Sequence, residues 1–312
     1  MNNQRLKWLY LLCGVIVIVA VVVSVTGIFN EIRGYANAEK YSVGETEIGE
    51  PVKNLSINWT SGKVSIAYHG ENTVEVREFS KKDLSEDQEL RWWLDGETLR
   101  IQFAKSGLRL NWDLEKELAV TLPEGMTLED AEINVTSADV TAKELKAENL
   151  SLNTTSGDAT IQAEAKKLAA NATSGALALT LTGEPHEIRI NSTSGNVLLE
   201  AEKAKKMKIG STSGNLEIHC AESEETELSS TSGTIRTNLK KIRQVKIGST
   251  SGSVTAALPQ TPGLTAEIST TSGDVNMEMP MEKDGKTWRC GDGSGKVSIS
   301  TTSGNVRIME AE

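Results

Sequence analysis

The chain has 312 residues, a formal net charge of −10 and only 4% aromatic residues. An acidic chain argues against nucleic-acid binding, where a basic footprint is expected. The scarcity of aromatic residues, together with many Gly, Ser and Thr residues, is typical of thin repetitive β-structure rather than of a large globular core.

The first predicted element is a transmembrane helix over residues 9–29, which contain no charged residue. About 20 apolar residues are needed to cross a bilayer as a helix. Arg5 and Lys7 lie in the short tail at residues 1–8, so the positive-inside rule predicts a cytoplasmic N-terminus and an extracytoplasmic remainder. The alternative is a signal peptide cleaved near Ala38, which would release a secreted protein.

Residues 30–49 are predicted to form a linker, and residues 50–130 an N-terminal β cap that includes the first coil. Alternating apolar stretches separated by turn residues, such as Leu90–Leu94 and Leu99–Phe103, indicate antiparallel hairpins. Four of the six tryptophans fall in this block: Trp59, Trp92, Trp93 and Trp112. The block is either an aromatic-rich cap that closes the first coil, as solenoids need, or an exposed platform for a ligand.

A short sequence repeat dominates residues 131–312. The tripeptide Thr-Ser-Gly occurs nine times, and its glycines are Gly62, Gly157, Gly175, Gly195, Gly214, Gly233, Gly252, Gly273 and Gly304. A variant of the motif ends at Ala138, and from there the spacings are 19, 18, 20, 19, 19, 19, 21 and 31 residues. A nearly fixed period of this length is typical of solenoid proteins, in which each repeat forms one coil.

The residues around the motif predict strands. The residue five positions before the last motif residue is apolar in all ten copies, and so is the residue two positions after it. Apolar residues at alternate positions indicate two short strands per coil with one face inward. Since one coil cannot bury its own inner face, the coils must stack. The predicted fold is therefore all-β, a single-stack β-solenoid (β-helix) of coils with a hairpin-rich N-terminal cap, preceded by one transmembrane helix.

The Thr-Ser-Gly motif itself is predicted to form a corner. Glycine is expected there to supply a positive φ, and the hydroxyl groups bond either to the turn backbone or to adjacent coils. Opposite this corner, charged segments of variable sequence, such as residues 202–206 and 222–226, indicate solvated loops. The insertion at residues 281–295, which contains Trp288, belongs to this variable edge and is either a solvated loop or part of a binding face.

Recognisable catalytic and metal-binding patterns are missing from the sequence. The three histidines are scattered and no Cys or His cluster has metal-ligand spacing, so no catalytic residue, cofactor or metal site is predicted. Cys220 and Cys290 either remain thiols or pair as a disulfide outside the cell. The sequence ends eight residues after Gly304, so its last residues are expected to leave an open sheet edge, which is either blocked by charged residues or covered by a second copy.

The repeated Ser-Thr-Ser-Gly-Asn/Asp-Val pattern, the hairpin block and the Leu-Pro-Glu-Gly step at residues 122–125 resemble a known bacterial family. Its members are β-strand-repeat domains of unknown function that are often labelled "putative adhesins". The resemblance extends over about residues 50–310. It implies a solenoid at the bacterial surface and no catalytic residues, and some relatives are described as components of envelope-stress responses.

The first functional hypothesis is a non-enzymatic, membrane-anchored surface scaffold or adhesin-like binding protein, whose partner is a cell-envelope component or a membrane protein. One alternative is a regulatory module of the cell-envelope stress response, which requires a signalling partner. Another is a polysaccharide-active enzyme, which requires acidic residues converging on one face. The residues expected to contact a ligand are Trp92, Trp93, Trp112 and Trp288.

Overall fold

The computed structural model describes residues 35–106 and 114–311, and these residues form β-structure almost throughout. The one helical segment in these ranges is a single 3-10 turn, η1 (Ala38–Lys40). No helix in them is long and apolar enough to span a membrane. The predicted transmembrane segment at residues 9–29 lies outside the described residues. The described chain falls into two compact units, an N-terminal unit that ends at Ala176 and a C-terminal unit that begins at Leu177.

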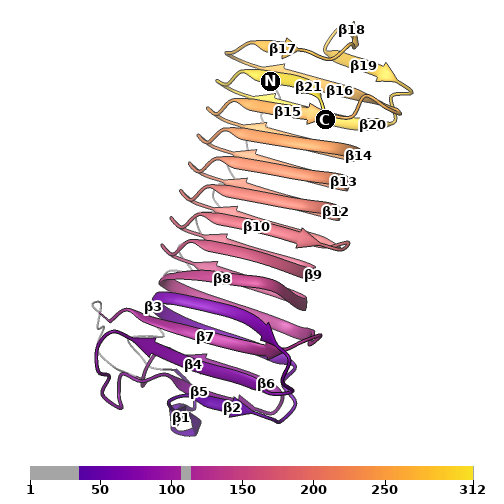
Figure 1. The fold of residues 1–312 in the computed structure, drawn as a ribbon. Coiled ribbons are helices and arrows are strands. Elements are labelled where there is room, and N and C mark those ends of the chain that lie inside the picture. Colours follow the sequence, from indigo (N-terminus) through magenta and orange to yellow (C-terminus); the bar gives the residue numbers. More distant parts are fainter. Residues whose placement is uncertain (1–34, 107–113, 312) are drawn as a thin grey trace. The chain divides into compact units, whose positions relative to one another are not determined.

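The N-terminal unit contains both short strands and the long strands β3, β8 and β9 (Figure 1). Its strands are β1 (Ser42–Val43), β2 (Thr46–Ile48), β3 (Asn54–His69), β4 (Val74–Ser80), β5 (Arg91–Asp95), β6 (Thr98–Gln102), β7 (Lys116–Pro123), β8 (Leu128–Thr154) and β9 (Ala159–Ala172).

The C-terminal unit begins with two short strands, continues with three long ones and ends with short ones. Its strands are β10 (Leu177–Thr182), β11 (Glu187–Ser192), β12 (Val197–Ser211), β13 (Leu216–Ser230), β14 (Ile235–Ser249), β15 (Val254–Leu258), β16 (Gly263–Thr270), β17 (Val275–Met277), β18 (Glu282–Asp284), β19 (Thr287–Gly291), β20 (Gly295–Thr301) and β21 (Val306–Glu310).

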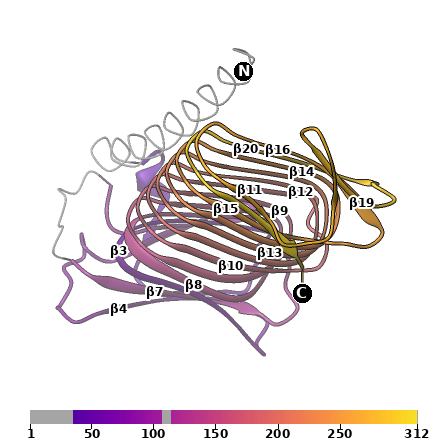
Figure 2. The ribbon, with the colours of Figure 1, turned by 90° about the horizontal axis from the view of Figure 1, so that it is seen from above.

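The coils of the C-terminal unit stack in parallel and in register. Ile209 of β12 lies beside Leu228 of β13, which lies beside Ile247 of β14. These three residues are at most 2% exposed. Figure 2 shows the strands of successive coils nested around a common interior. The predicted all-β architecture of stacked coils, each with inward-facing apolar residues on both sides of the motif, is therefore confirmed.

The variable edge opposite the motif is a bend within a strand rather than a loop. β13 runs without interruption through residues 222–226, and Glu222 and Glu225 stay in register with both neighbouring strands. The prediction of a solvated loop is wrong for these coils, because neighbouring coils of equal length keep their parallel pairing through the bend. Residues 183–186, which include Gly183 and Pro185, do interrupt the strand of their coil and divide it into β10 and β11, which both pair with β12.

The motif glycines are required by a close approach between coils. A Cβ atom on Gly233 would lie 2.0 Å from the carbonyl oxygen of Gly214, and one on Gly252 would lie 2.0 Å from that of Gly233. Neither Gly233 nor Gly252 has a positive φ, so the predicted reason for glycine is wrong at these corners. Ala138 lies within the continuous strand β8, and Gly157 of the next coil approaches it just as closely, since a Cβ on Gly157 would lie 1.8 Å from the carbonyl oxygen of Ala138.

The hydroxyl group just before the motif holds the corner locally. Ser249 Oγ donates a hydrogen bond to the carbonyl oxygen of Gly252 at 2.8 Å, and Thr154 Oγ1 donates to that of Gly157 at 2.7 Å. Between coils the bonds come from the backbone, as in the 2.8 Å bond from the N–H of Ser251 to the carbonyl oxygen of Thr231. These hydroxyl groups belong to the residue before the motif, so the bonds predicted for the motif's own Thr and Ser hydroxyl groups stay a prediction.

The Asn residue after the glycine links one coil to the next. Oδ1 of Asn196 accepts the backbone N–H of Asn215 at 2.9 Å, and Oδ1 of Asn215 accepts that of Thr234 at 2.9 Å. The side chain therefore satisfies a backbone donor at the same corner position of the neighbouring coil. This explains the preference for Asn or Asp at this position in physical terms.

The last coils are stacked in an order that differs from their order in the chain. β20 pairs with β14 on one side and with β16 on the other, and β21 likewise lies between β15 and β17. β16 and β17 therefore form the outermost coil, and the last strands of the chain, β20 and β21, lie between two other coils of the stack. The expectation of an open edge at the end of the chain is wrong, because that segment folds back between two coils. β19, from the insertion at residues 281–295, runs antiparallel along β16 and caps it.

The N-terminal unit shows the same exchange of order. β3 lies directly beside β8, so Gly62 stacks on Ala138, and β6 and β7 form a coil on the other side of β3. β5 runs antiparallel to β6, which confirms the predicted hairpin, and β4 runs antiparallel to β7. The coil formed by β6 and β7 was not predicted, because it lacks the motif.

Candidate functional site

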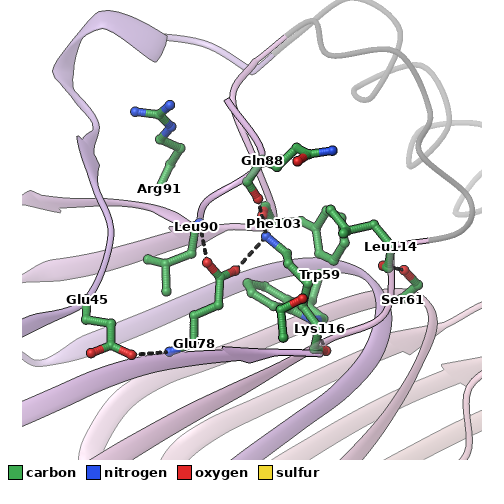
Figure 3. A network of polar contacts seen from close by, with 12 residues as sticks. Glu45, Trp59, Ser61, Glu78, Gln88, Leu90, Arg91, Phe103, Leu114 and Lys116 are labelled. Carbon is green, nitrogen blue, oxygen red and sulfur yellow. Dashed lines mark hydrogen bonds and ion pairs between the residues drawn. The ribbon is translucent and has the colours of Figure 1, made fainter. Parts of the chain in front are cut away.

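The N-terminal unit contains a buried ion pair, shown in Figure 3. Lys116, the first residue of β7, lies in register with Gly62 and so stands where other coils have a motif glycine. The side chain of Lys116 is 0% exposed, and that of Glu78 in β4 is 6% exposed. Lys116, Glu78, Trp59 and Phe103 are called the buried polar cluster below.

Every donor of the Lys116 ammonium group has an acceptor. Nζ lies 2.5 Å from Oε1 of Glu78, donates to the carbonyl oxygen of Gln88 at 2.6 Å, and donates to that of Phe103. The rings of Phe103 and Trp59 complete the surroundings, with centroids 4.1 Å and 5.0 Å from Nζ. Cation–π contacts of this kind strengthen when the cation is desolvated.

Burial shifts the pKa values of both partners of the ion pair. Burial lowers the pKa of Lys116, and the carboxylate of Glu78 opposes that shift. Burial raises the pKa of Glu78, and the charge of Lys116 opposes it, helped by the N–H of Leu90, which donates to Oε2 at 3.0 Å. Perturbed pKa values often mark functional sites, but structural ion pairs produce them as well. This pair joins β4, β7 and the segments that carry Gln88 and Phe103, so it holds the cap together.

The sequence patterns alone do not single out Lys116 or Glu78 as partners. The one signal at Lys116 is a lone cation directly before the alternating apolar residues of β7. At Glu78 the alternating pattern of β4 places the carboxylate on the same inward face as Val74 and Val76, and the antiparallel pairing with β7 brings it to Lys116. Such a partnership between distant residues has no local signature.

Trp93 belongs to an aromatic cluster on the cap. Its ring meets Tyr41 edge-on with 5.7 Å between centroids, and Tyr41 meets Tyr35 at 4.7 Å. Nζ of Lys40 lies 4.8 Å from the centroid of the Trp93 ring. Burial raises the pKa of Tyr35 to about 12. We call Tyr35, Lys40, Tyr41 and Trp93 the aromatic cluster; its three rings are half-buried, so part of each remains open to solvent.

The four tryptophans predicted to contact a ligand do not form one site. Trp92 and Trp93 are neighbours on β5, and both are half-buried. Trp288 belongs to β19 of the C-terminal unit, where Nζ of Lys283 lies 4.9 Å from its ring centroid. Trp112 lies outside the described residues. Ligand contact by any of these residues stays a prediction.

Residues 52–309 match the family described as Toastrack DUF4097. The chain belongs to this family. The Toastrack match confirms the resemblance inferred from the repeated motif. Two solved structures are similar to the Toastrack chain, and no curated protein matches it.

One of these structures is a "putative cell adhesion protein" from Clostridium sporogenes ATCC 15579, with 16% identity and a TM-score of 0.23. It covers 86% of this chain and 100% of its own. The other is a "putative adhesin" from Bacteroides fragilis NCTC 9343, with 12% identity, a TM-score of 0.35, and coverage of 86% and 97%.

The two cysteines of the Toastrack fold are free thiols. Cys220 is buried and Cys290 is half-buried, so of the two predicted states the chain adopts the unpaired one. Burial raises the pKa of the Cys220 thiol to about 11, which keeps it protonated and unreactive at neutral pH. Within residues 35–106 and 114–311, no group of three or more His, Cys, Asp or Glu side chains is arranged to hold a metal ion.

Charged side chains on the variable edge of the C-terminal unit pair between coils. Nζ of Lys241 lies 2.6 Å from Oε1 of Glu222, and the Arg243 guanidinium lies 2.7 Å from Glu225. These four side chains are exposed, so each pair contributes little to stability. Because acidic residues of one coil face basic residues of the next, these charges favour one order of coils that are otherwise similar.

Proposed function

We propose that this Toastrack chain is a non-enzymatic, adhesin-like surface scaffold. In this proposal residues 9–29 anchor it in the membrane, and the β-structure outside the cytoplasm binds a cell-envelope component or a membrane protein. The aromatic cluster and the β18–β19 hairpin supply the contact surfaces.

The closed state of the buried polar cluster is the observation that carries the proposal. Lys116 and Glu78 have the strongly desolvated charges that catalysis often uses, yet each is committed to structural partners and has almost no contact with solvent. The half-buried rings of Trp93 and Trp288 instead offer amphipathic area of the kind that binding surfaces use. A solenoid that holds such rings on paired strands presents them with little loss of conformational entropy.

A regulatory role in the envelope-stress response is the second candidate, favoured by the family resemblance. This role requires a membrane partner that carries the signal.

Deletion of the gene, followed by complementation, tests the two roles against each other. Wild-type chain, Trp93→Ala and Trp288→Ala are returned separately, with Leu198→Ala as the matched control, since Leu198 is an exposed apolar residue (37%) outside both surfaces. Adhesion and envelope-antibiotic susceptibility are measured together with a stress reporter. The proposal expects reduced adhesion in the deletion and in at least one tryptophan variant, with an unchanged reporter. An altered reporter with normal adhesion would overturn it.

A further inference from the structure

The outermost coil of the C-terminal unit is covered over only half of its length. β19 runs antiparallel along β16, and β18 extends that cover. Of the described strands, β21 alone is in register with β17, and it occupies one edge. Within residues 35–106 and 114–311 no strand pairs with the other edge of β17, whereas in the N-terminal unit both halves of the outermost coil, β6 and β7, are covered by β5 and β4.

The backbone of β17 offers hydrogen-bonding groups along this edge. The carbonyl oxygen of Asp274 accepts the N–H of Val306, and the N–H of Glu278 donates to Ile308, so these residues face β21. In a strand the backbone groups of successive residues point to opposite edges. The N–H and C=O groups of Val275 and Met277 therefore point to the uncovered edge.

The apolar side chains of β17 are also incompletely covered. Val275 and Met277 are half-buried, while Val306 and Ile308, the equivalent residues of the neighbouring strand, are 0% exposed. Another strand along the free edge would bury them as the inner coils bury theirs. The edge thus has both the polar and the apolar parts of a site for strand addition.

The outward-facing side chains determine which strand fits. Asp274, Asn276 and Glu278 are exposed on the outer face. An antiparallel second copy that uses the N–H groups of both Val275 and Met277 would be centred on Asn276, and it would place Asp274 opposite Glu278 twice. Like charges directly opposite each other destabilise a strand pair, so self-association in this register is disfavoured.

The strand already paired with β17 shows the preferred chemistry. Arg307 of β21 reaches across to Glu278 with two bonds, from Nε at 2.9 Å and Nη2 at 2.7 Å. β21 itself alternates apolar and basic residues through Val306, Arg307 and Ile308. A strand added on the free edge would meet the same acidic outer face. Among the described residues, no basic side chain forms an ion pair with Asp274.

We propose that the free edge of β17 binds an extended segment of a partner protein by β-strand addition. The segment has basic residues on either side of an apolar–polar–apolar core, so that its apolar side chains cover Val275 and Met277 and its basic side chains lie opposite Asp274 and Glu278. This edge adds a surface and a partner chemistry to the proposed binding function. It rests on that function in one respect, which is that the partner is a separate protein.

A synthetic peptide tests the proposal directly. The full chain is titrated against a fluorescent, end-blocked peptide whose centre is Lys-Val-Thr-Ile-Lys, with a control peptide that has Glu in place of both Lys residues. The expected result is saturable binding of the first peptide at or below about 1 mM and none of the second. Absence of binding by the basic peptide, or equal binding of both peptides, would overturn the proposal.

Variants separate the edge from general electrostatic attraction. Asp274→Lys should weaken binding about fivefold, and Glu217→Lys, the same change on the exposed face of the fully paired strand β13, should not. Met277→Pro removes an edge N–H without touching the bonds to β21 and should weaken binding about tenfold, more than Met277→Ala does. Circular dichroism melting checks that each variant is folded.

Three further outcomes would refute the strand site. Unchanged binding by a folded Met277→Pro variant would mean that the peptide is held by charge alone. Concentration-dependent dimerisation of the full chain by light scattering, abolished by Met277→Pro, would mean that the edge binds a second copy instead. Loss of adhesion in the gene deletion with no peptide binding would refute the strand site and leave the scaffold proposal standing.

Discussion

Replacement of Lys116 by Met tests the structural role of the buried polar cluster. The substitution keeps the length of the side chain but leaves the Glu78 carboxylate, which is 6% exposed, with the N–H of Leu90 as its remaining described donor. It also deprives the carbonyl oxygens of Gln88 and Phe103 of their bonds to Nζ. Removal of one partner of a buried ion pair costs about 3–5 kcal/mol. For a unit of this size the expected fall in melting temperature is about 10 °C.

Urea denaturation followed by tryptophan fluorescence measures this loss, because Trp59 lies against the ammonium group. The control is Lys208→Met, which removes an exposed cation 3.5 Å from Glu227 and should change the free energy of unfolding by less than about 1 kcal/mol. A second variant, Lys116→Met with Glu78→Leu, removes both charges and should recover part of the loss. If Lys116→Met costs no more than Lys208→Met, the pair does not hold the cap together and the reasoning is refuted.

Two further predictions concern the C-terminal unit. Gly233→Ala places a Cβ 2.0 Å from the carbonyl oxygen of Gly214 and should lower the free energy of unfolding by about 2–4 kcal/mol. The control is Gly70→Ala, whose Cβ has no atom within 4 Å and which should change that free energy by less than about 1 kcal/mol. Equal effects of the two substitutions in urea denaturation would contradict the close-approach explanation. The Cys220 thiol has a pKa of about 11 when folded and 9.0 when unfolded, so the unfolded state loses its proton first and stability should fall by about 1–3 kcal/mol between pH 9 and 11. Cys220→Ala should show a shallower fall over that window, and an identical pH profile would disprove the assignment.

The repeat made most of the fold predictable from sequence. Apolar residues at fixed positions around the glycine predict inward-facing strands, because a stacked coil repeats the same environment at every level. The order of the coils was not predictable in the same way. The motif at Gly304 fits between those of Gly252 and Gly273 as well as it would fit beyond them, since all three coils share the same apolar and corner residues.

The functional residues were harder to predict than the fold. Trp93 was singled out because large aromatic residues are rare in this chain, but its packing against Tyr41 and Lys40 depends on how residues before the repeats fold onto β5. Lys116 and Glu78 stand at inward-facing positions of their alternating strands, but that they meet each other depends on the pairing between the distant strands β4 and β7. Sequence periodicity reports the environment of a position, and it does not report which distant residue shares that environment.

The placement of β20 and β21 between two earlier coils has a consequence for biogenesis. As the chain emerges, β16 and β17 are available before their final neighbours, and the free neighbours at that moment are β14 and β15. Residues 268–277 and 299–308 are identical at Ile, Ser, Thr, Thr, Ser, Gly and Val, so the earlier segment can occupy the later one's place almost without loss. Native assembly then requires the outer coil to yield that place to the last strands. Residues 295–310 are therefore needed before the coils of the C-terminal unit can take the order described.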